Sequence, residues 1–216
     1  MKSKRRYDMT GRAAKAAATK ARICDAAIAL YRGRPIADFT LEEVATRADT
    51  TVQTVLRDFG SKDELVYAAL DEMARGGVFL KSTPPGDVKA AVAAFFDIYE
   101  SIGDMVMRRL DEERRRPALK PILEEGRTNH RQGVKAAFAP QLAWLSGAAR
   151  ARLLTSLVVL TDVYVWKLLR RDMTHGRTAA EAIVVRMISG VVEQEKPDGE
   201  VPDAVAELVG RREPAA

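Results

Sequence analysis

The stretch TLEEVATRADTTVQTVLRDFGSKDEL, residues 40–65, decides how the N-terminal part of the chain folds. Thr40 and Glu43 have the spacing of a capping box, in which two side chains satisfy free N–H groups at the start of a helix. Ser61 and Glu64 repeat that spacing. A short polar turn lies between the two boxes, so the stretch predicts a helix-turn-helix followed at once by another helix.

The second helix of this motif is predicted to have an apolar face and a polar face. Its apolar positions recur at helical spacing and are expected to be buried: Val52, Val55, Leu56 and Phe59. Its polar positions are expected to be exposed: Thr51, Gln53, Thr54 and Arg57. Gln pairs with adenine, Arg with guanine or phosphate, and Thr with phosphate or the thymine methyl group. Because a recognition helix reads bases mainly with its N-terminal residues, the pattern favours DNA binding.

Three charged residues near this helix bear on that hypothesis. Lys62 opens the next helix, where its ammonium and the free backbone N–H groups are expected to meet a phosphate. Asp49 and Asp58 oppose DNA binding, because carboxylates repel phosphate. Two capped helices with a polar face also occur in many helical proteins, so an ordinary structural pair is the alternative interpretation.

The first 22 residues are strongly basic. Their cationic side chains are Lys2, Lys4, Arg5, Arg6, Arg12, Lys15, Lys20 and Arg22, against Asp8 alone. Such a segment commonly binds a polyanion, and we expect residues 1–18 to be a flexible arm whose Arg5 and Arg6 reach a DNA minor groove. The alternatives are a helical protein that binds membrane surfaces, one that binds nucleic acid non-specifically without an effector response, and a solvated tail. Few bulky apolar residues precede Ile23, which disfavours the membrane role.

Composition indicates an all-helical protein. Of 216 residues, 47% are hydrophobic and 30% charged, with few aromatic residues and abundant Ala, Leu, Arg and Glu. A single cysteine, Cys24, and two histidines allow neither an internal disulfide nor a Cys/His zinc site, so we expect a cytoplasmic protein without metal or cofactor. The most apolar stretch, Leu153–Thr161, is far shorter than the ~20 residues of a membrane span. No nucleophile with its base and no phosphate-binding glycine loop is recognisable, so we expect no enzyme activity.

A set of fixed spacings runs through residues 20–70. The positions are Ile23, Ala26, Ala27, Leu30 and Tyr31 in the first helix, Thr40, Val44, Ala45 and Ala48 in the second, and Thr54, Phe59, Lys62 and Leu65 beyond the turn. With these positions the segment resembles the DNA-binding domain of the TetR family of bacterial transcriptional regulators. The resemblance implies DNA contacts from Thr40, Thr51, Gln53, Thr54, Arg57 and Lys62. The sequence departs from the family pattern at Asp49 in the turn, at Leu56, where a tyrosine often reaches phosphate, and at Asp58.

The segment Ser82–Asp87, STPPGD, separates two regions of helical pattern. We expect residues 19–66 to form the helix-turn-helix domain and residues 67–216 to form an effector-binding and dimerisation domain. Helices of the second domain are predicted near 87–101, 103–115, 119–139, 147–173 and 178–194. The predicted fold is therefore all-α, with an N-terminal three-helix domain and a C-terminal helical bundle that forms a homodimer.

The region 151–173, ARLLTSLVVLTDVYVWKLLRRDM, is apolar over too many faces for a surface helix. In proteins that the chain resembles, the last two long helices pair with their two-fold copies and the C-terminal helices bind a small effector. Such a dimer reads a palindrome in double-stranded DNA with recognition helices ~34 Å apart. We therefore expect a repressor that a small apolar effector releases from DNA.

The residues of an effector pocket are harder to choose from sequence. The candidates are Phe95, Phe96, Tyr99, Met105, Tyr164 and Trp166 as apolar walls, with His130, Thr161 and Asp162 as polar determinants. For each of them, ordinary core packing is the alternative interpretation.

Overall fold

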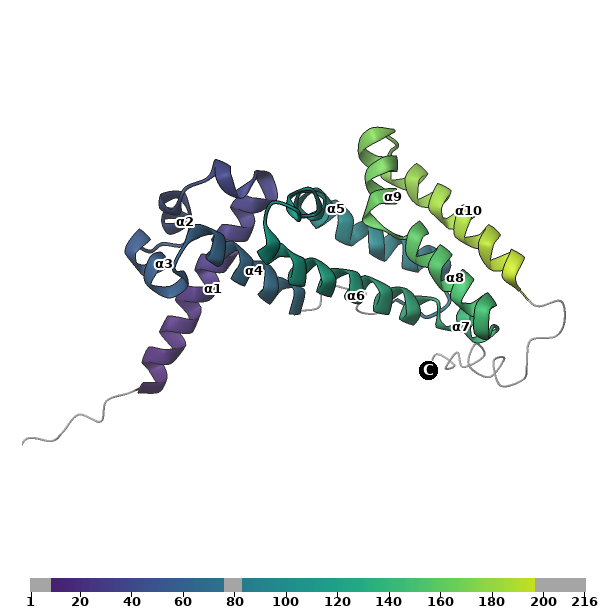
Figure 1. Ribbon diagram of the computed structural model, residues 1–216, viewed down its shortest axis with the longest axis horizontal. Helices are drawn as coiled ribbons and strands as arrows, with labels where there is room; N and C mark the ends of the chain where they lie inside the picture. Colours follow the sequence, from purple (N-terminus) through teal and green to yellow (C-terminus); the bar gives the residue numbers. More distant parts are fainter. Residues whose placement is uncertain (1–8, 76–82, 197–216) are drawn as a thin grey trace, which may run out of the picture. The chain divides into compact units, whose positions relative to one another are not determined.

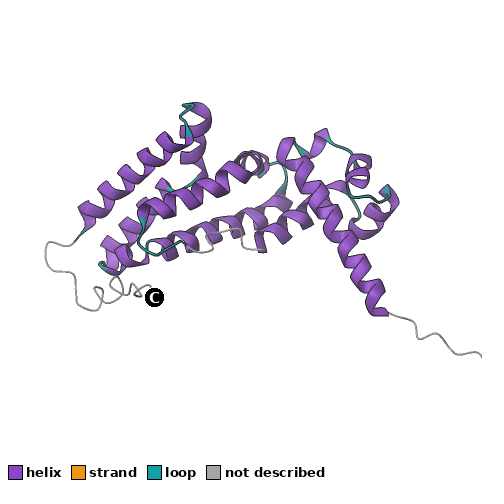
Figure 2. Ribbon diagram, turned by 180° about the vertical axis from the view of Figure 1, so that it is seen from behind, coloured by secondary structure: helices purple, strands orange, loops and turns teal. Residues whose placement is uncertain are grey.

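The computed structural model describes residues 9–75 and 83–196. Every regular element in these ranges is helical, which confirms the predicted all-α class (Figures 1 and 2). The chain divides into two compact units, Met1–Gly76 and Gly77–Ala216. Within the described ranges, no helix combines the length and the apolar character that crossing a bilayer requires.

The first unit is a small helical domain with its own core. Its elements are α1 (Met9–Gly33), the 3₁₀ turn η1 (Ile36–Asp38), α2 (Leu41–Arg47), α3 (Val52–Phe59) and α4 (Lys62–Arg75). α1 packs against α2 and α4, and α3 packs against the same two helices. The fully buried side chains include Ile23, Tyr31, Phe39, Val44, Val55 and Leu65. The predicted domain boundary at residue 66 falls inside α4, which lies entirely within this unit.

α1 begins earlier than the sequence pattern predicts. We expected a flexible arm through residue 18, but the helix starts at Met9, so residues 9–18 correct that boundary. Side chains 13–18 are exposed and make no core. The helix continues through them because this run is rich in alanine, which has the highest helix propensity.

The second unit is a bundle built around one long helix, α5 (Val88–Glu112). Its other elements are η2 (Pro117–Leu119), α6 (Lys120–Ala137), α7 (Ala139–Ala143), α8 (Gly147–Leu160), α9 (Val163–Lys167), the π-helical turn η3 (Leu168–Asp172) and α10 (Arg177–Glu195). α5 packs against α6, α9 and α10, while α8 packs against α6, α7 and α10. The bundle therefore has a core to which every long helix contributes, including Phe95, Met105, Leu157, Trp166 and Ile188.

α5 is continuous where two helices were predicted. The predicted break near residue 102 is wrong, because the helix runs through Gly103 without interruption. A Cβ atom at Gly103 would clash with the indole ring of Trp166, so the glycine provides space for a neighbour. Asp87 caps the helix start by accepting the Ala90 N–H at 2.9 Å.

The predicted single helix 147–173 is broken after Leu160. The Thr161 hydroxyl donates to the Leu157 carbonyl at 2.8 Å, which satisfies an acceptor at the end of α8. Asp162 is the N-cap of α9 and accepts the Tyr164 N–H at 3.0 Å. Capping residues compete with the helical backbone for hydrogen bonds, so two adjacent caps end one helix and start the next.

Candidate functional site

The turn of the helix-turn-helix is closed by hydrogen bonds on both sides. At α2, Thr40 accepts the Glu43 N–H and the Glu43 carboxylate accepts the Thr40 N–H, which confirms the predicted capping box. At α3, the Thr51 hydroxyl oxygen accepts the Thr54 N–H at 3.2 Å and lies 3.0 Å from the Thr54 hydroxyl. These hydrogen bonds fix the backbone and the two threonine side chains at the start of α3.

Asp49 has a φ of 50°, the left-handed region that a glycine occupies most easily. Asp and Asn tolerate this region better than other side chains. The turn is held to the first helix, because Arg22 Nε donates to the carbonyl of the adjacent Ala48 at 3.2 Å. Asp49 thus adopts this conformation at a cost in strain, and its side chain is exposed.

The outer face of α3 combines polar side chains with one apolar side chain. Gln53 and Arg57 are exposed as predicted, and Val55 is fully buried. The prediction that Leu56 is buried is wrong: 42% of its surface is exposed. Since Val55 takes the inward position, Leu56 is turned by about 100° to the outer face.

Asp58 lies against Arg57. Arg57 Nε donates to the Asp58 carboxylate at 2.9 Å, and the side chains are 70% and 13% exposed. The carboxylate that was expected to oppose DNA is thus mostly covered and paired, while most of the guanidinium surface stays open to solvent.

Lys62 has a structural contact. Its ammonium donates to the Phe39 carbonyl at 2.6 Å and lies 5.3 Å from the centre of the Phe39 ring. The side chain thereby joins the start of α4 to the segment before α2. Arg5 and Arg6 lie outside the described residues.

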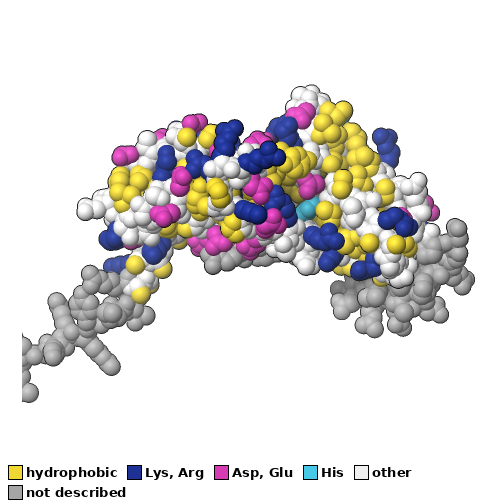
Figure 3. All heavy atoms as spheres, in the orientation of Figure 1, with side chains coloured by type: hydrophobic (Ala, Val, Ile, Leu, Met, Phe, Trp, Pro, Cys, Tyr) yellow, Lys and Arg dark blue, Asp and Glu magenta, His cyan; other side chains and the backbone are white. Residues whose placement is uncertain are grey.

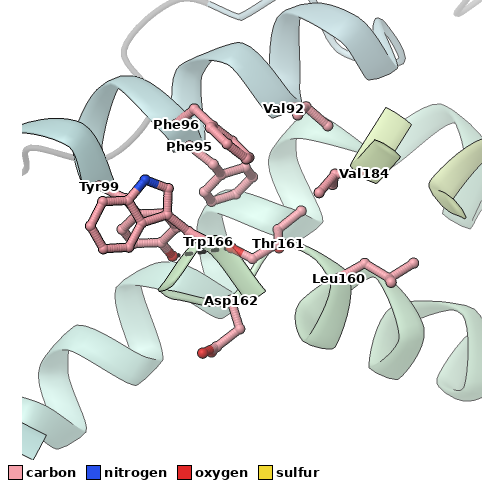
Figure 4. Close-up of a pocket in the computed structure, with 9 residues that line it drawn as sticks. All are labelled: Val92, Phe95, Phe96, Tyr99, Leu160, Thr161, Asp162, Trp166 and Val184. Carbon is pink, nitrogen blue, oxygen red and sulfur yellow. Dashed lines mark hydrogen bonds between the residues drawn. The ribbon is translucent and has the colours of Figure 1, made fainter. Parts of the chain in front are cut away.

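A small cavity lies inside the second unit (Figure 4). Its walls are Val92, Phe95, Phe96, Tyr99, Leu160, Thr161, Asp162, Trp166 and Val184. The structure thus brings six of the nine predicted pocket residues to one place. The free volume is about 10 Å³, which is room for about one water molecule.

The polar edge of the cavity is a connected cluster. The Tyr99 hydroxyl donates to the Thr161 carbonyl at 3.1 Å, and His130 Nε2 lies 3.0 Å from the Thr161 hydroxyl. Because that hydroxyl already donates to Leu157, it accepts from His130, so Nε2 carries the proton. His130 Nδ1 faces the Asp162 carboxylate at 3.9 Å.

Burial lowers the pKa of His130, although Asp162 opposes the shift. The neutral ring also meets Phe95 edge-on, with 5.4 Å between ring centres. His130 therefore joins the aromatic wall of the cavity to its polar edge.

Three predicted pocket residues do not line the cavity: His130 contacts its polar edge through Thr161, and Met105 and Tyr164 lie elsewhere. Tyr164 is 56% exposed and does not line the cavity. Met105 is buried but does not line the cavity. Sequence reasoning missed Glu100, whose carboxylate accepts from Trp166 Nε1 at 3.1 Å and from Arg170 Nη2 at 3.2 Å. The sequence signal that could have identified Glu100 is an acidic residue within a mostly apolar stretch.

Large apolar side chains are exposed on the C-terminal helices. They are Val159 on α8, Tyr164 on α9, Leu168 and Met173 around η3, and Met187 on α10. Figure 3 shows hydrophobic side chains gathered over α9 and α10 on the face in view. Few soluble proteins leave so many large apolar groups on neighbouring helices without a partner.

The described residues contain no cluster suited to bind a metal ion. In residues 9–75 and 83–196, no three His, Cys, Asp or Glu side chains are placed to hold one metal ion. Cys24 is buried, and burial together with Glu72 raises the pKa of its thiol to about 11. A thiol with such a pKa is a poor nucleophile.

Comparison with known proteins identifies the first unit. Residues 23–69 match the family model described as bacterial regulatory proteins, tetR family. The structure is similar to a tetR-family transcriptional regulator from Streptomyces coelicolor, with a TM-score of 0.63, 14% identity, and coverage of 88% of this chain and 98% of that chain. A TetR transcriptional regulator from Rhodococcus sp. RHA1 also matches, with a TM-score of 0.40, 24% identity, and coverage of 81% and 95%. Among the curated proteins, none matches this chain.

These findings define the fold. The chain shares with the Streptomyces coelicolor regulator a fold in which a helix-turn-helix unit precedes a helical bundle. Within this fold, the match to the family model of bacterial regulatory proteins, tetR family, covers residues 23–69.

Proposed function

We propose that the protein is a sequence-specific repressor that binds a palindromic operator as a homodimer in the cytoplasm and leaves it when a small apolar effector binds. The observation that carries the proposal is the outer face of α3. Gln53 is exposed there, and the described residues offer its amide no hydrogen-bond partner. An amide held on a capped helix with both its donor and its acceptor open is equipped to read an adenine edge.

The other DNA contacts surround Gln53. Thr40 and Thr51 are exposed at the starts of α2 and α3, where side chains and backbone N–H groups meet phosphate. Thr54 is next to Thr51, and Arg57 follows one turn after Gln53. Lys62 contributes positive charge at the start of α4, and Arg5 and Arg6 are proposed to enter the adjacent minor groove.

The proposed dimer partner is a second copy of this chain, joined through α8 and α10. The exposed apolar side chains of α8, α9, η3 and α10 supply the surface for such a contact. In a two-fold dimer each subunit contributes the same surface patch to the interface. One apolar patch on each chain is therefore enough to form the interface. Two α3 helices then enter successive major grooves, about 34 Å apart.

The proposed effector site is the cavity between α5, α8, α9 and α10. Its walls are aromatic and aliphatic, and its polar groups are confined to one edge around Thr161. The cavity holds about one water molecule, so an effector has to bind a wider conformation. An effector that binds the wider conformation more tightly shifts the equilibrium between the two conformations towards it. The size of this shift is set by the difference between the effector's affinities for the two conformations.

A gel-shift titration on the DNA upstream of the protein's own gene tests the proposal. We expect sequence-selective binding that weakens steeply with salt. Gln53→Ala and Arg57→Ala are expected to weaken it, whereas the matched controls Gln132→Ala and Arg131→Ala, on the exposed face of α6, leave it unchanged. Binding with the same affinity for every sequence would support the alternative, a non-specific nucleic-acid-binding protein.

A further inference from the structure

One large apolar side chain stands among the polar residues of the outer face of α3. Leu56 is 42% exposed, although a leucine gains free energy when its surface leaves water. Gln53 and Arg57 are exposed on the same helix. At 3.6 residues per turn, these three side chains occupy an arc of about 100°. Leu56 therefore belongs to the face proposed to meet DNA and lies at one edge of it, next to Gln53.

The major groove offers this side chain a specific counterpart. Base edges there present hydrogen-bond donors and acceptors, and the C5-methyl group of thymine is the apolar exception. A leucine that covers polar edges removes water from them without replacing its hydrogen bonds, which is unfavourable. A leucine against a thymine methyl group buries apolar surface on both sides and costs no hydrogen bond.

We propose that Leu56 is a specificity-determining residue that contacts the C5-methyl group of a thymine in each operator half-site. The proposal rests on the DNA-binding function proposed above. Leu56 follows Gln53 by three residues, about 4.5 Å along the helix axis, which is comparable with the ~3.4 Å rise of one base. The thymine is therefore expected in the base pair that Gln53 reads or in the next one.

The neighbouring side chains leave Leu56 available for this contact. The Arg57 guanidinium is drawn towards Asp58 through its Nε, and the Thr51 and Thr54 hydroxyls lie against each other at the helix start. Val55, the next residue inward, fills the core position, so Leu56 is not needed to complete the packing of α3. Truncation of Leu56 should then leave the domain folded.

The test uses the full chain and an operator in which each thymine of a half-site is replaced, one at a time, by deoxyuridine. This change removes the methyl group and keeps every hydrogen bond. Fluorescence anisotropy at fixed salt measures Kd. The wild type is expected to lose about fourfold in affinity at one position per half-site, the effect of one methyl group. Leu56→Ala is expected to bind thymine and deoxyuridine DNA equally well, while Gln53→Ala keeps the discrimination.

The outcomes separate this proposal from the one on which it rests. If the wild type binds no DNA selectively, the proposed regulatory function fails. If it binds selectively but ignores deoxyuridine, or if Leu56→Ala keeps the full discrimination, the thymine contact alone is overturned. A uniform loss of affinity by Leu56→Ala on all sequences would instead place the side chain on the sugar-phosphate backbone. Circular dichroism of Leu56→Ala, matching the wild type, excludes unfolding as the cause.

Discussion

Gly103 in α5 lies directly against the indole ring of Trp166 in α9. A Cβ atom at residue 103 would overlap the ring, so the close approach of the two helices depends on the absence of a side chain there. The same indole lines the cavity and donates to Glu100, which Arg170 also holds. The glycine thereby sets the position of one cavity wall.

Gly103→Ala is expected to destabilise the protein by about 1–3 kcal/mol, because the ring has to move in a packed core. Gly126→Ala in α6 is the matched control: apart from its chain neighbours and the surrounding helix backbone, no atom lies within 4 Å of its added Cβ, so the higher helix propensity of alanine should raise stability by about 0.5–1 kcal/mol. Urea unfolding of the two variants measures both effects. Equal stabilities would contradict the role assigned to the contact.

Asp49 is expected to weaken DNA binding through its charge and to reduce stability through its φ of 50°. Asp49→Asn removes the charge and keeps a side chain that tolerates this region, so affinity should rise with little change in stability. Asp49→Gly should raise affinity and also stabilise the fold, by about 1 kcal/mol. Thermal melting and DNA titration separate the two effects. A lower affinity in Asp49→Asn would show that the carboxylate itself contacts the operator.

His130 is expected to make stability depend on pH. Burial lowers its pKa in the folded state, so the unfolded chain binds a proton more readily, with an ordinary histidine pKa of about 6.5. This contribution to stability is complete above pH 6.5 and is lost as the pH falls from there towards the lowered folded value. Urea unfolding between pH 5 and 7.5 should show the loss in the wild type and a weaker one in His130→Gln.

His175→Gln serves as the control for that experiment. His175 is half-buried in the turn between η3 and α10, outside the cavity. The variant should keep the pH dependence of the wild type. If His130→Gln keeps it as well, another group is responsible.

Leu168→Asp is expected to convert the proposed dimer to a monomer. The side chain is 49% exposed in η3, so the substitution should leave the folded subunit intact while it places a charge in the interface. Analytical ultracentrifugation should show half the mass, and operator affinity should fall because one half-site contact is lost. Thr128→Asp, on the exposed side of α6, is the matched control and should leave the oligomeric state unchanged. A monomeric wild type would refute the proposed interface.

Local chemistry made the helix-turn-helix predictable. A capping box acts between residues three positions apart, so Thr40 and Glu43 can be recognised without any knowledge of the rest of the fold. The same holds for the glycine that ends α3, Gly60, which adopts a φ of 81°. The exposure of Gln53 and Arg57 also follows from helical periodicity once the buried face is known.

The cavity was harder to predict. Phe95, Tyr99 and Trp166 were candidates because aromatic residues favour apolar pockets, and the structure brings them together. Met105 and Tyr164 are also large apolar or aromatic residues in helical segments, yet Met105 is in the core and Tyr164 is on the surface. Which side of each helix faces the core depends on how α5 and α9 pack together, and these helices are far apart in sequence.

By itself, the sequence determined the all-α class, the capped helix-turn-helix and the polar start of α3, because these depend on interactions within a few residues. Only the tertiary structure decided that Leu56 is exposed and that α5 continues through Gly103. The exposure of a side chain and the continuity of a long helix depend on which segments pack against them. At Gly103 that segment is α9, whose Trp166 ring occupies the space that a side chain at residue 103 would need.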